Sequence, residues 1–309
     1  NTEGDYNVAM GYYALGAATT ADKNVAVGSG AGQSITTGAN NVAIGADALD
    51  ANTTASNNTA VGNAALGANT TGATNTAIGN EALDANTTAS NNVAVGHGAL
   101  TVDTLGSKST AMGTNALQNQ NFTTATDSFN TALGFHAGYA VTTGDRNTLI
   151  GALAGDAFNT GAANVAVGYL ALSADTKGSS NVAVGRSALT AQNFTTGTDS
   201  FNTAVGDRAG TSVTTGTANT LIGGLAGDAI TTGTNNVVLG YAALSASQAG
   251  THNTAIGNAV LANLNASGAN FNTAVGAGAG NVVTSGIRNT LIGAAAGDAL
   301  TDADDNVAI

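Results

Sequence analysis

The sequence predicts an all-β fold, a parallel β-solenoid in which each coil is one 17-residue repeat. Three observations lead to this prediction. They are a fixed short period, a stretch in each repeat with the alternation of a strand, and a paired exchange of large and small residues within the repeat. We expect a single repeat domain over residues 1–309 with about 17 coils, a fragment of a longer chain. Residues 109–180 and 181–252 form two super-repeats, and residues 253–309 form a partial third.

The period is carried by the stretch N-[TV]-A-[aliphatic]-G. Its position 1 is Asn in 17 of 18 occurrences, with Ser109 as the exception, and its position 5 is Gly in all 17 repeats that reach it. Seventeen residues are too few for a helical-hairpin repeat, which favours a β-roll. The occurrences are spaced by 17 residues except for steps of 21, 21 and 19, and they begin at residues 7, 24, 41, 58, 75, 92, 109, 130, 147, 164, 181, 202, 219, 236, 253, 272, 289 and 306.

Positions 2–4 of each repeat are predicted to form a strand that pairs in parallel with its copy in the next coil. Position 2 is a β-branched Thr or Val, which favours a strand. Position 4 is always large and aliphatic, as in Met10, Val27 and Ile44, so we expect it to face the interior. The Ala residues at positions 3 and 8 would then form apolar stripes on the outside. A second short strand and a turn are expected in the remaining dozen residues.

Positions 9 and 12 exchange a large apolar residue between them. In the seven repeats with Gly at position 9, position 12 is large and apolar, as in Gly32 with Ile35. In the ten repeats with Leu at position 9, position 12 is small or polar in all but one, as in Leu83 with Asn86, and Leu264 is the exception. Conservation of volume between two sites indicates a packed interior rather than low-complexity disorder.

Positions 1 and 5 are predicted to be structural. Stacked coils place successive Asn side chains about 4.8 Å apart, where their amides can form a hydrogen-bonded ladder. Glycine at position 5 allows the positive φ of a corner. Representative ladder residues are Asn24, Asn41, Asn58, Asn75 and Asn92, and the corresponding corner residues are Gly28, Gly45, Gly62, Gly79 and Gly96.

The stretches NVAVGSGAG, NVAIGADAL and NTAVGNAAL resemble the head repeats of trimeric autotransporter adhesins, and still more the NTAIG…AL…NTTG repeats of bacteriophage tail fibres. The resemblance covers residues 7–309. It implies a left-handed roll, three chains side by side, and an attachment role outside the cell, on a cell surface or a virion. The 17-residue period departs from the roughly 14 of the adhesin heads, and no membrane anchor or fibre-tip domain is present.

The three longer repeats interrupt the pattern and are the candidate binding regions, because function in a solenoid tends to lie where the repeat is broken. Aromatic side chains on protruding loops can recognise a glycan or protein receptor. The alternative is that each ring folds back to cover a bulge or contact a neighbouring chain. Five of the seven phenylalanines lie in these insertions: Phe122, Phe129, Phe194, Phe201 and Phe271.

Composition narrows the function. The net charge of −12 disfavours nucleic acid and anionic membrane as partners, and no apolar run is long enough for insertion into a membrane. We expect no enzyme and no cofactor, because His97, His136 and His252 occupy unrelated positions with no nucleophile–base pair. The acidic segment 301–306 is interpreted as a solvated turn, with a calcium site as the alternative.

The leading hypothesis is a homotrimeric structural and adhesive segment, with a host-surface glycan or protein as possible receptor. The alternative is an ice-binding β-solenoid. Its drawback is that the Thr pairs are adjacent, so that only one per coil can point to a given face. Glycosylation is a minor alternative at the N-x-[ST] sequences, which begin at Asn52, Asn69, Asn86, Asn121, Asn193 and Asn265.

Overall fold

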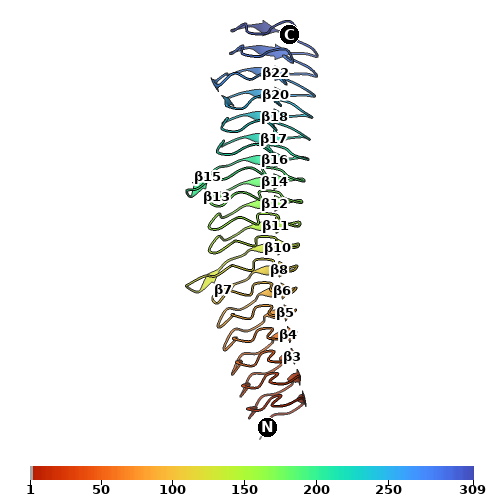
Figure 1. Ribbon diagram of the computed structural model, residues 1–309, viewed down its shortest axis with the longest axis vertical. Coiled ribbons are helices and arrows are strands. Elements are labelled where there is room, and N and C mark those ends of the chain that lie inside the picture. The colour runs from red at the N-terminus through yellow and green to blue at the C-terminus, as the bar shows by residue number, and fades with distance from the viewer. Residues whose placement is uncertain (1–2) are drawn as a thin grey trace. The chain divides into compact units, whose positions relative to one another are not determined.

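The computed structural model describes residues 3–309, and the chain is an all-β parallel β-solenoid of about 18 turns. No helix occurs among these residues (Figure 1). The predicted fold class is confirmed at this level. The chain divides into two compact units, Asn1–Ala152 and Leu153–Ile309, called unit 1 and unit 2 below.

In unit 1, nine short strands of the described residues pair in parallel, each with its copy in the next coil. The register is strict, so that Thr59 lies beside Thr76 and Ala60 beside Ala77. In chain order these strands are β1 (Val8–Met10), β2 (Val25–Val27), β3 (Val42–Ile44), β4 (Thr59–Val61), β5 (Thr76–Ile78), β6 (Val93–Val95), β8 (Thr110–Met112), β10 (Thr131–Leu133) and β11 (Thr148–Ile150).

Unit 2 repeats this arrangement with nine strands of its own, again parallel and in chain order. The strands are β12 (Val165–Val167), β14 (Val182–Val184), β16 (Thr203–Val205), β17 (Thr220–Ile222), β18 (Val237–Leu239), β20 (Thr254–Ile256), β22 (Thr273–Val275), β23 (Thr290–Ile292) and β24 (Val307–Ala308).

The predicted orientation of the strands is wrong. Position 3 faces the interior: Ala60 and Ala77 are fully buried, and position 8 is buried in the same way in most coils, as Ala65 shows. Position 4 faces outward, so that Ile44 and Ile78 are 39% and 41% exposed. The physical reason is that position 3 shares one interior volume with positions 9 and 12: where Leu at position 9 fills that volume, position 3 is Ala or, once, Val, and the larger aliphatic residue at position 4 lies on the outside.

The expected second strand is absent from the regular coils of the described chain, except in the three coils that precede a longer one, where it is only two residues long: β7 (Gly106–Ser107), β13 (Gly178–Ser179) and β19 (Gly250–Thr251). The residues after each strand form turns, and backbone hydrogen bonds still join one coil to the next, as from Leu49 N to Ala65 O at 3.0 Å. Positions 7 and 9 adopt the left-handed conformation, with φ of 54° at Asp47 and 53° at Leu49. This alternation of handedness is incompatible with a strand.

The exchange between positions 9 and 12 is confirmed as interior packing. A Cβ added to Gly32 would lie 2.9 Å from Cδ1 of Ile35 and 3.2 Å from Cδ2 of Leu15, so these two side chains fill the space above the glycine. Where position 9 is Leu, as at Leu49, it is fully buried. The polar residues at position 12 are buried too, and Asn86 donates to Oδ1 of Asn69 at 2.8 Å. They form a second, interior polar column that the sequence interpretation missed.

Candidate functional site

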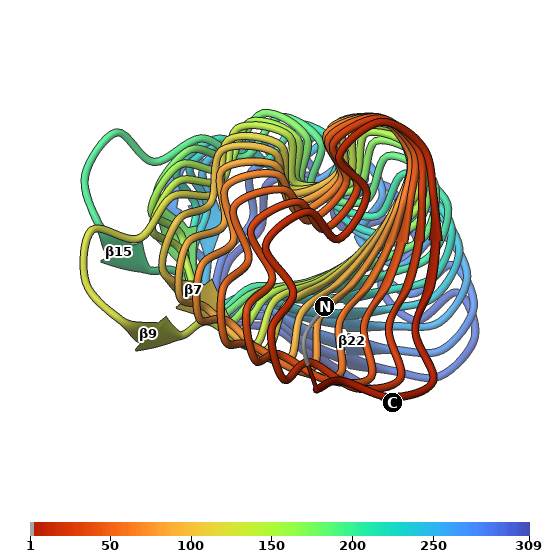
Figure 2. The same ribbon diagram turned by 90° about the horizontal axis from the view of Figure 1, so that it is seen from below.

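The described residues contain three pairs of short side strands, each formed between a longer coil and the 17-residue coil that precedes it. These strands pair in parallel as β7 (Gly106–Ser107) with β9 (Thr126–Asp127), β13 (Gly178–Ser179) with β15 (Thr198–Asp199), and β19 (Gly250–Thr251) with β21 (Gly268–Ala269). The segments that carry β9 and β15 leave the outline shared by the regular coils of their own units (Figure 2). The insertions therefore form lateral loops, as the sequence predicts.

Two of the five phenylalanines proposed for recognition are buried. Phe122 and Phe194 are only 5% and 7% exposed. The ring of Phe122 lies over Gly106, where an added Cβ would be 2.7 Å from Cδ2 of the ring. Both side chains fold back and are buried, and the ring of Phe122 packs on the preceding coil, so neither ring offers an open surface to a ligand.

The other three phenylalanines are exposed, with 53% for Phe129, 62% for Phe201 and 53% for Phe271. Each immediately precedes a position-1 Asn and has a φ near 50°, in the left-handed region. Lys108 Nζ lies 5.2 Å from the ring centroid of Phe129, and His252 lies 4.9 Å from Phe271 between centroids. Phe201 makes no aromatic or cation–π contact of this kind within residues 3–309. Each ring is an exposed feature at the end of its own insertion.

A buried carboxylate anchors the first insertion. Asp103 is fully buried, and its Oδ1 accepts from Gly106 N at 2.9 Å and from Phe122 N at 3.4 Å. Its Oδ2 accepts from Nε2 of Gln120. Burial raises the pKa of Asp103, while these hydrogen bonds lower it by less. The carboxylate is buried and hydrogen-bonded to the backbone that it positions, so it is not accessible to a substrate.

A buried aspartate anchors the second insertion in the same way, and the two insertions differ in the position-1 residue at which the longer coil begins. Asp175 Oδ1 accepts from Gly178 N at 2.9 Å and from Phe194 N at 3.2 Å, and Gln192 donates to its Oδ2 at 2.6 Å. Here the preceding rung is Asn181, whose Oδ1 accepts from Asn202 N at 3.1 Å. In unit 1 the rung is Ser109, which instead shares a hydrogen bond of 2.5 Å with Ser128.

The position-1 asparagines form the ladder in each unit. Asn75 is fully buried: its Oδ1 accepts from Asn92 N at 2.9 Å, and its Nδ2 donates to Ala89 O at 2.9 Å. Each side chain therefore satisfies one backbone group in the next coil and one in its own coil. The other rungs repeat this, with backbone N to Oδ1 distances of 2.8–3.0 Å at Asn41, Asn58 and Asn75.

The corner glycines are required for two reasons. Gly79 has φ of +141°, a region that residues with a side chain rarely adopt. An added Cβ would also approach Gly96 O to within 2.4 Å, because successive corners stack directly. Gly28, Gly45, Gly62 and Gly96 share this conformation, with φ between 134° and 140°.

The N-x-[ST] sequences differ in accessibility. Asn52, Asn69 and Asn86 are fully buried in the interior polar column and cannot carry a glycan in the folded chain. Asn193 and Asn265 are exposed on the insertion loops. The loops are therefore the places where this modification is sterically possible.

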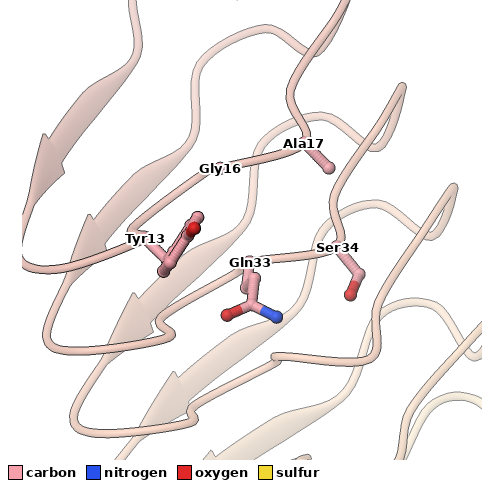
Figure 3. A pocket seen from close by; sticks show the side chains of 5 residues that line it. All are labelled: Tyr13, Gly16, Ala17, Gln33 and Ser34. Carbon is pink, nitrogen blue, oxygen red and sulfur yellow. The ribbon is translucent and has the colours of Figure 1, made fainter.

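A shallow surface pocket in unit 1 is lined by Tyr13, Gly16, Ala17, Gln33 and Ser34 (Figure 3). It forms where the small residues Gly16 and Ala17 leave space beside Gln33 of the next coil. None of the five residues is His, Asp, Glu, Lys or Arg. The pocket thus offers a shape but no general acid–base pair.

Within residues 3–309, no group of three or more His, Asp or Glu side chains is placed to hold a metal ion. In the acidic segment 301–306, Asp305 is paired with Arg288 at 2.6 and 2.8 Å. His136 stacks between Phe135 and Tyr139, with centroid distances of 3.9 and 4.7 Å.

The search for membrane-crossing helices in residues 3–309 finds none with sufficient length and apolar character. No protein-family model matches the sequence, and no curated protein matches it. The architecture and the surface chemistry of the chain therefore carry the functional argument.

Proposed function

We propose that the chain is a homo-oligomeric structural and adhesive segment of an extracellular fibre, such as a phage tail fibre or a bacterial surface adhesin. One observation carries this proposal: the outward face of the stacked strands is apolar and uncharged. Positions 2–4 of the 18 strands contain no Asp, Glu, Lys or Arg in a chain of net charge −12. Twelve of the 22 exposed large apolar side chains of the described residues lie at positions 2 and 4.

An in-register apolar sheet face of this kind needs a partner, because large exposed apolar patches mark interaction sites. The face is two side-chain columns wide, one of Thr and Val at position 2 and one of Ile, Val, Leu and Met at position 4. Three such narrow strips can meet around a threefold axis, and identical chains match in register because every coil has the same height. A left-handed, side-by-side homotrimer is accordingly the assembly that we propose.

The rest of the surface supports a role in spacing and attachment. The interior ladders hold successive coils in fixed register, which gives each unit a rigid scaffold. The insertion segments that carry β9 and β15 extend laterally from the outline of the regular coils (Figure 2), and each insertion ends on an exposed phenylalanine. A virion or cell-surface location follows from this role and is part of the proposal.

The assembly is testable by single-cysteine cross-linking, because the chain contains no cysteine. Ile78→Cys places a thiol on the outward face, and oxidation should yield disulfide-linked dimers on a non-reducing gel. Thr88→Cys is the matched control, since Thr88 is exposed in a turn of the same coil and should remain unlinked. Equal cross-linking of both variants, or of neither, would count against the proposed interface.

Ice binding remains a second candidate because the outward column contains regularly spaced threonines, including Thr59 and Thr76. In each turn pair the hydroxyl of the first threonine donates to the next coil, as from Thr36 Oγ1 to Thr53 O at 3.1 Å, so only the second threonine, such as Thr37, offers an exposed hydroxyl. Thermal hysteresis of the purified chain separates the two functions. Clear activity would favour ice binding, and its absence would favour the fibre.

A further inference from the structure

Position 6 of five successive coils in unit 2 forms a continuous surface row. Backbone hydrogen bonds fix the spacing, from Arg208 N to Arg186 O at 2.8 Å, from Leu225 N to Asp207 O at 3.0 Å and from Ala242 N to Gly224 O at 3.0 Å. Four steps between coils give the row a length of about 19 Å. We call it the Tyr169–Tyr241 row, and its members are Tyr169, Arg186, Asp207, Gly224 and Tyr241.

A half-exposed tyrosine closes each end of the row. Tyr169 is 51% exposed and Tyr241 is 58% exposed. The ring of Tyr241 lies against Gly224, where an added Cβ would be 3.5 Å from Cδ2 and 3.8 Å from Cε2. Because Gly224 has no side chain, the ring of Tyr241 can pack along the row. Each end offers an aromatic surface at a fixed height on a rigid scaffold.

The centre of the row carries a bidentate ion pair. Arg186 donates from Nε to Asp207 Oδ1 at 2.8 Å and from Nη2 to Oδ2 at 3.0 Å. Arg208 Nε lies 3.5 Å from the same Oδ2. The hydrogen bond from Arg186 lowers the pKa of Asp207, which therefore stays ionised at neutral pH. The exposed edges of the three groups provide fixed donors and acceptors between the two rings.

We infer that the Tyr169–Tyr241 row is a binding surface for an extended neutral polysaccharide. Sugar rings present apolar C–H faces, which stack on aromatic rings, and hydroxyls, which pair with guanidinium and carboxylate groups. A straight, open row suits a polymer better than a compact small molecule, which needs an enclosing pocket. This inference deepens the proposed attachment function and rests on it.

The charge of the row argues for a neutral ligand. Arg186 and Arg208 are balanced in large part by Asp207, and Asp228 lies close enough for Arg208 to lower its pKa, although burial raises that pKa more. The chain as a whole is strongly acidic. A polyanion would gain little here and would be repelled at longer range.

The N-terminal coil provides a matched control. Tyr12 also occupies position 6 and is 74% exposed, but the next two residues of its column are Ser29 and Ala46. It has the same side chain at the same repeat position, but position 6 of the next four coils (Ser29, Ala46, Asn63 and Asn80) carries neither a charged residue nor a tyrosine. Removing its ring should not affect polysaccharide binding.

The test is affinity electrophoresis of the full chain in gels containing a soluble α-glucan, β-glucan, mannan or galactan. We expect retardation by at least one of them, with Tyr169→Ala and Tyr241→Ala each weakening the apparent Kd by about tenfold. Arg186→Gln should weaken it too, and Tyr12→Ala should not. Thermal melting of each variant verifies folding.

Failure to be retarded by any of the four polysaccharides would overturn the inference, as would an equal loss in Tyr12→Ala. Retardation only by a polyanion, such as hyaluronate, or binding only to a peptide would also overturn it. Sedimentation of the same samples reports assembly independently. A retarded monomer would reject the proposed oligomer and retain the site, whereas an oligomer without retardation would do the reverse.

Discussion

The inner and outer faces of the strands differ in a way opposite to that of a typical solvated sheet. The inner face carries alanine, as at Ala60 and Ala77, and the outer face carries larger aliphatic residues, as at Val61 and Ile78. In a solvated sheet the larger apolar residues face the core. The difference teaches that the interior is filled by the side chains of positions 3, 9 and 12 and by polar ladders, while the larger aliphatic residues of position 4 lie on the outer face.

The largest effect is expected from breaking the inner ladder. Asn75→Ala removes the acceptor of Asn92 N and one of the two donors to Ala89 O. Ala89 O keeps its hydrogen bond from Asn86 Nδ2 at 3.1 Å. At 1–3 kcal/mol for the unsatisfied Asn92 N and about 1 kcal/mol for the lost bond to Ala89 O, the free energy of unfolding should fall by up to about 4 kcal/mol. Chemical denaturation measures this. Asn80→Ala, which removes a longer surface contact to Asn63, is the control and should cost under about 1 kcal/mol. Similar losses in both variants would refute the ladder's role.

The exchange between positions 9 and 12 can be tested by transferring the large side chain from position 9 to position 12 within one coil. Leu49→Gly leaves a cavity and should cost about 3 kcal/mol, after a partial offset from relief of the left-handed backbone. Adding Asn52→Ile copies the arrangement of Gly32 with Ile35 in the preceding coil and should recover most of that loss. Denaturant melts of the two single variants and the double variant give the coupling energy. Simple additivity would contradict the shared volume.

Substitutions on the inner and outer faces of one strand should change stability by smaller and unequal amounts. Ala77→Leu overpacks the interior and should cost about 2 kcal/mol. Ile78→Leu, one residue along on the outer face, should change stability by under about 1 kcal/mol. Thermal melting of both variants makes the comparison. A tolerated Ala77→Leu would show that the interior is wider than described.

The smallest effect concerns the pH dependence of stability. Burial raises the pKa of Asp103 above its unfolded value, so the folded chain binds more protons than the unfolded chain between those two pKa values. This carboxyl therefore favours folding fully below the unfolded pKa, and that contribution is lost as the pH rises through the folded pKa. Asp103→Asn should remove this part of the pH slope of Tm as the pH rises above the ordinary Asp pKa of about 4.

The raised pKa values of Asp50 and Asp84 remain in both proteins, so the difference between the two slopes isolates Asp103. An identical slope in the variant would contradict the assignment.

Sequence reasoning predicted the solenoid, the coil boundaries and the packing exchange, because each is a periodic property that one chain reports many times. It assigned the wrong face to the strand, since alternation alone does not say which side is inside. A signal was present: Leu149, Leu221 and Leu291 replace alanine at position 3 only in coils with Gly at position 9. An added Cβ at Gly138 would lie 2.7 Å from Cδ1 of Leu149, which shows that position 3 shares the interior volume.

The candidate sites were less predictable. The length of the insertions indicated lateral loops, but the burial of Phe122 depends on the buried Asp103 and on the space above Gly106, which sequence spacing does not reveal. The Tyr169–Tyr241 row was missed because its members are 17 or 21 residues apart, and only the stacking of coils brings them into one line.

Sedimentation equilibrium of the purified chain tests the central claim, that the outer strand face is an interface between copies, most directly. The chain has a mass of 29.6 kDa, and a trimer has three times that mass, about 89 kDa. The account predicts the trimeric mass for the wild-type chain and a shift toward the single-chain mass for Ile78→Lys, with the fold retained. A wild-type chain that sediments as a folded monomer at all concentrations would contradict it.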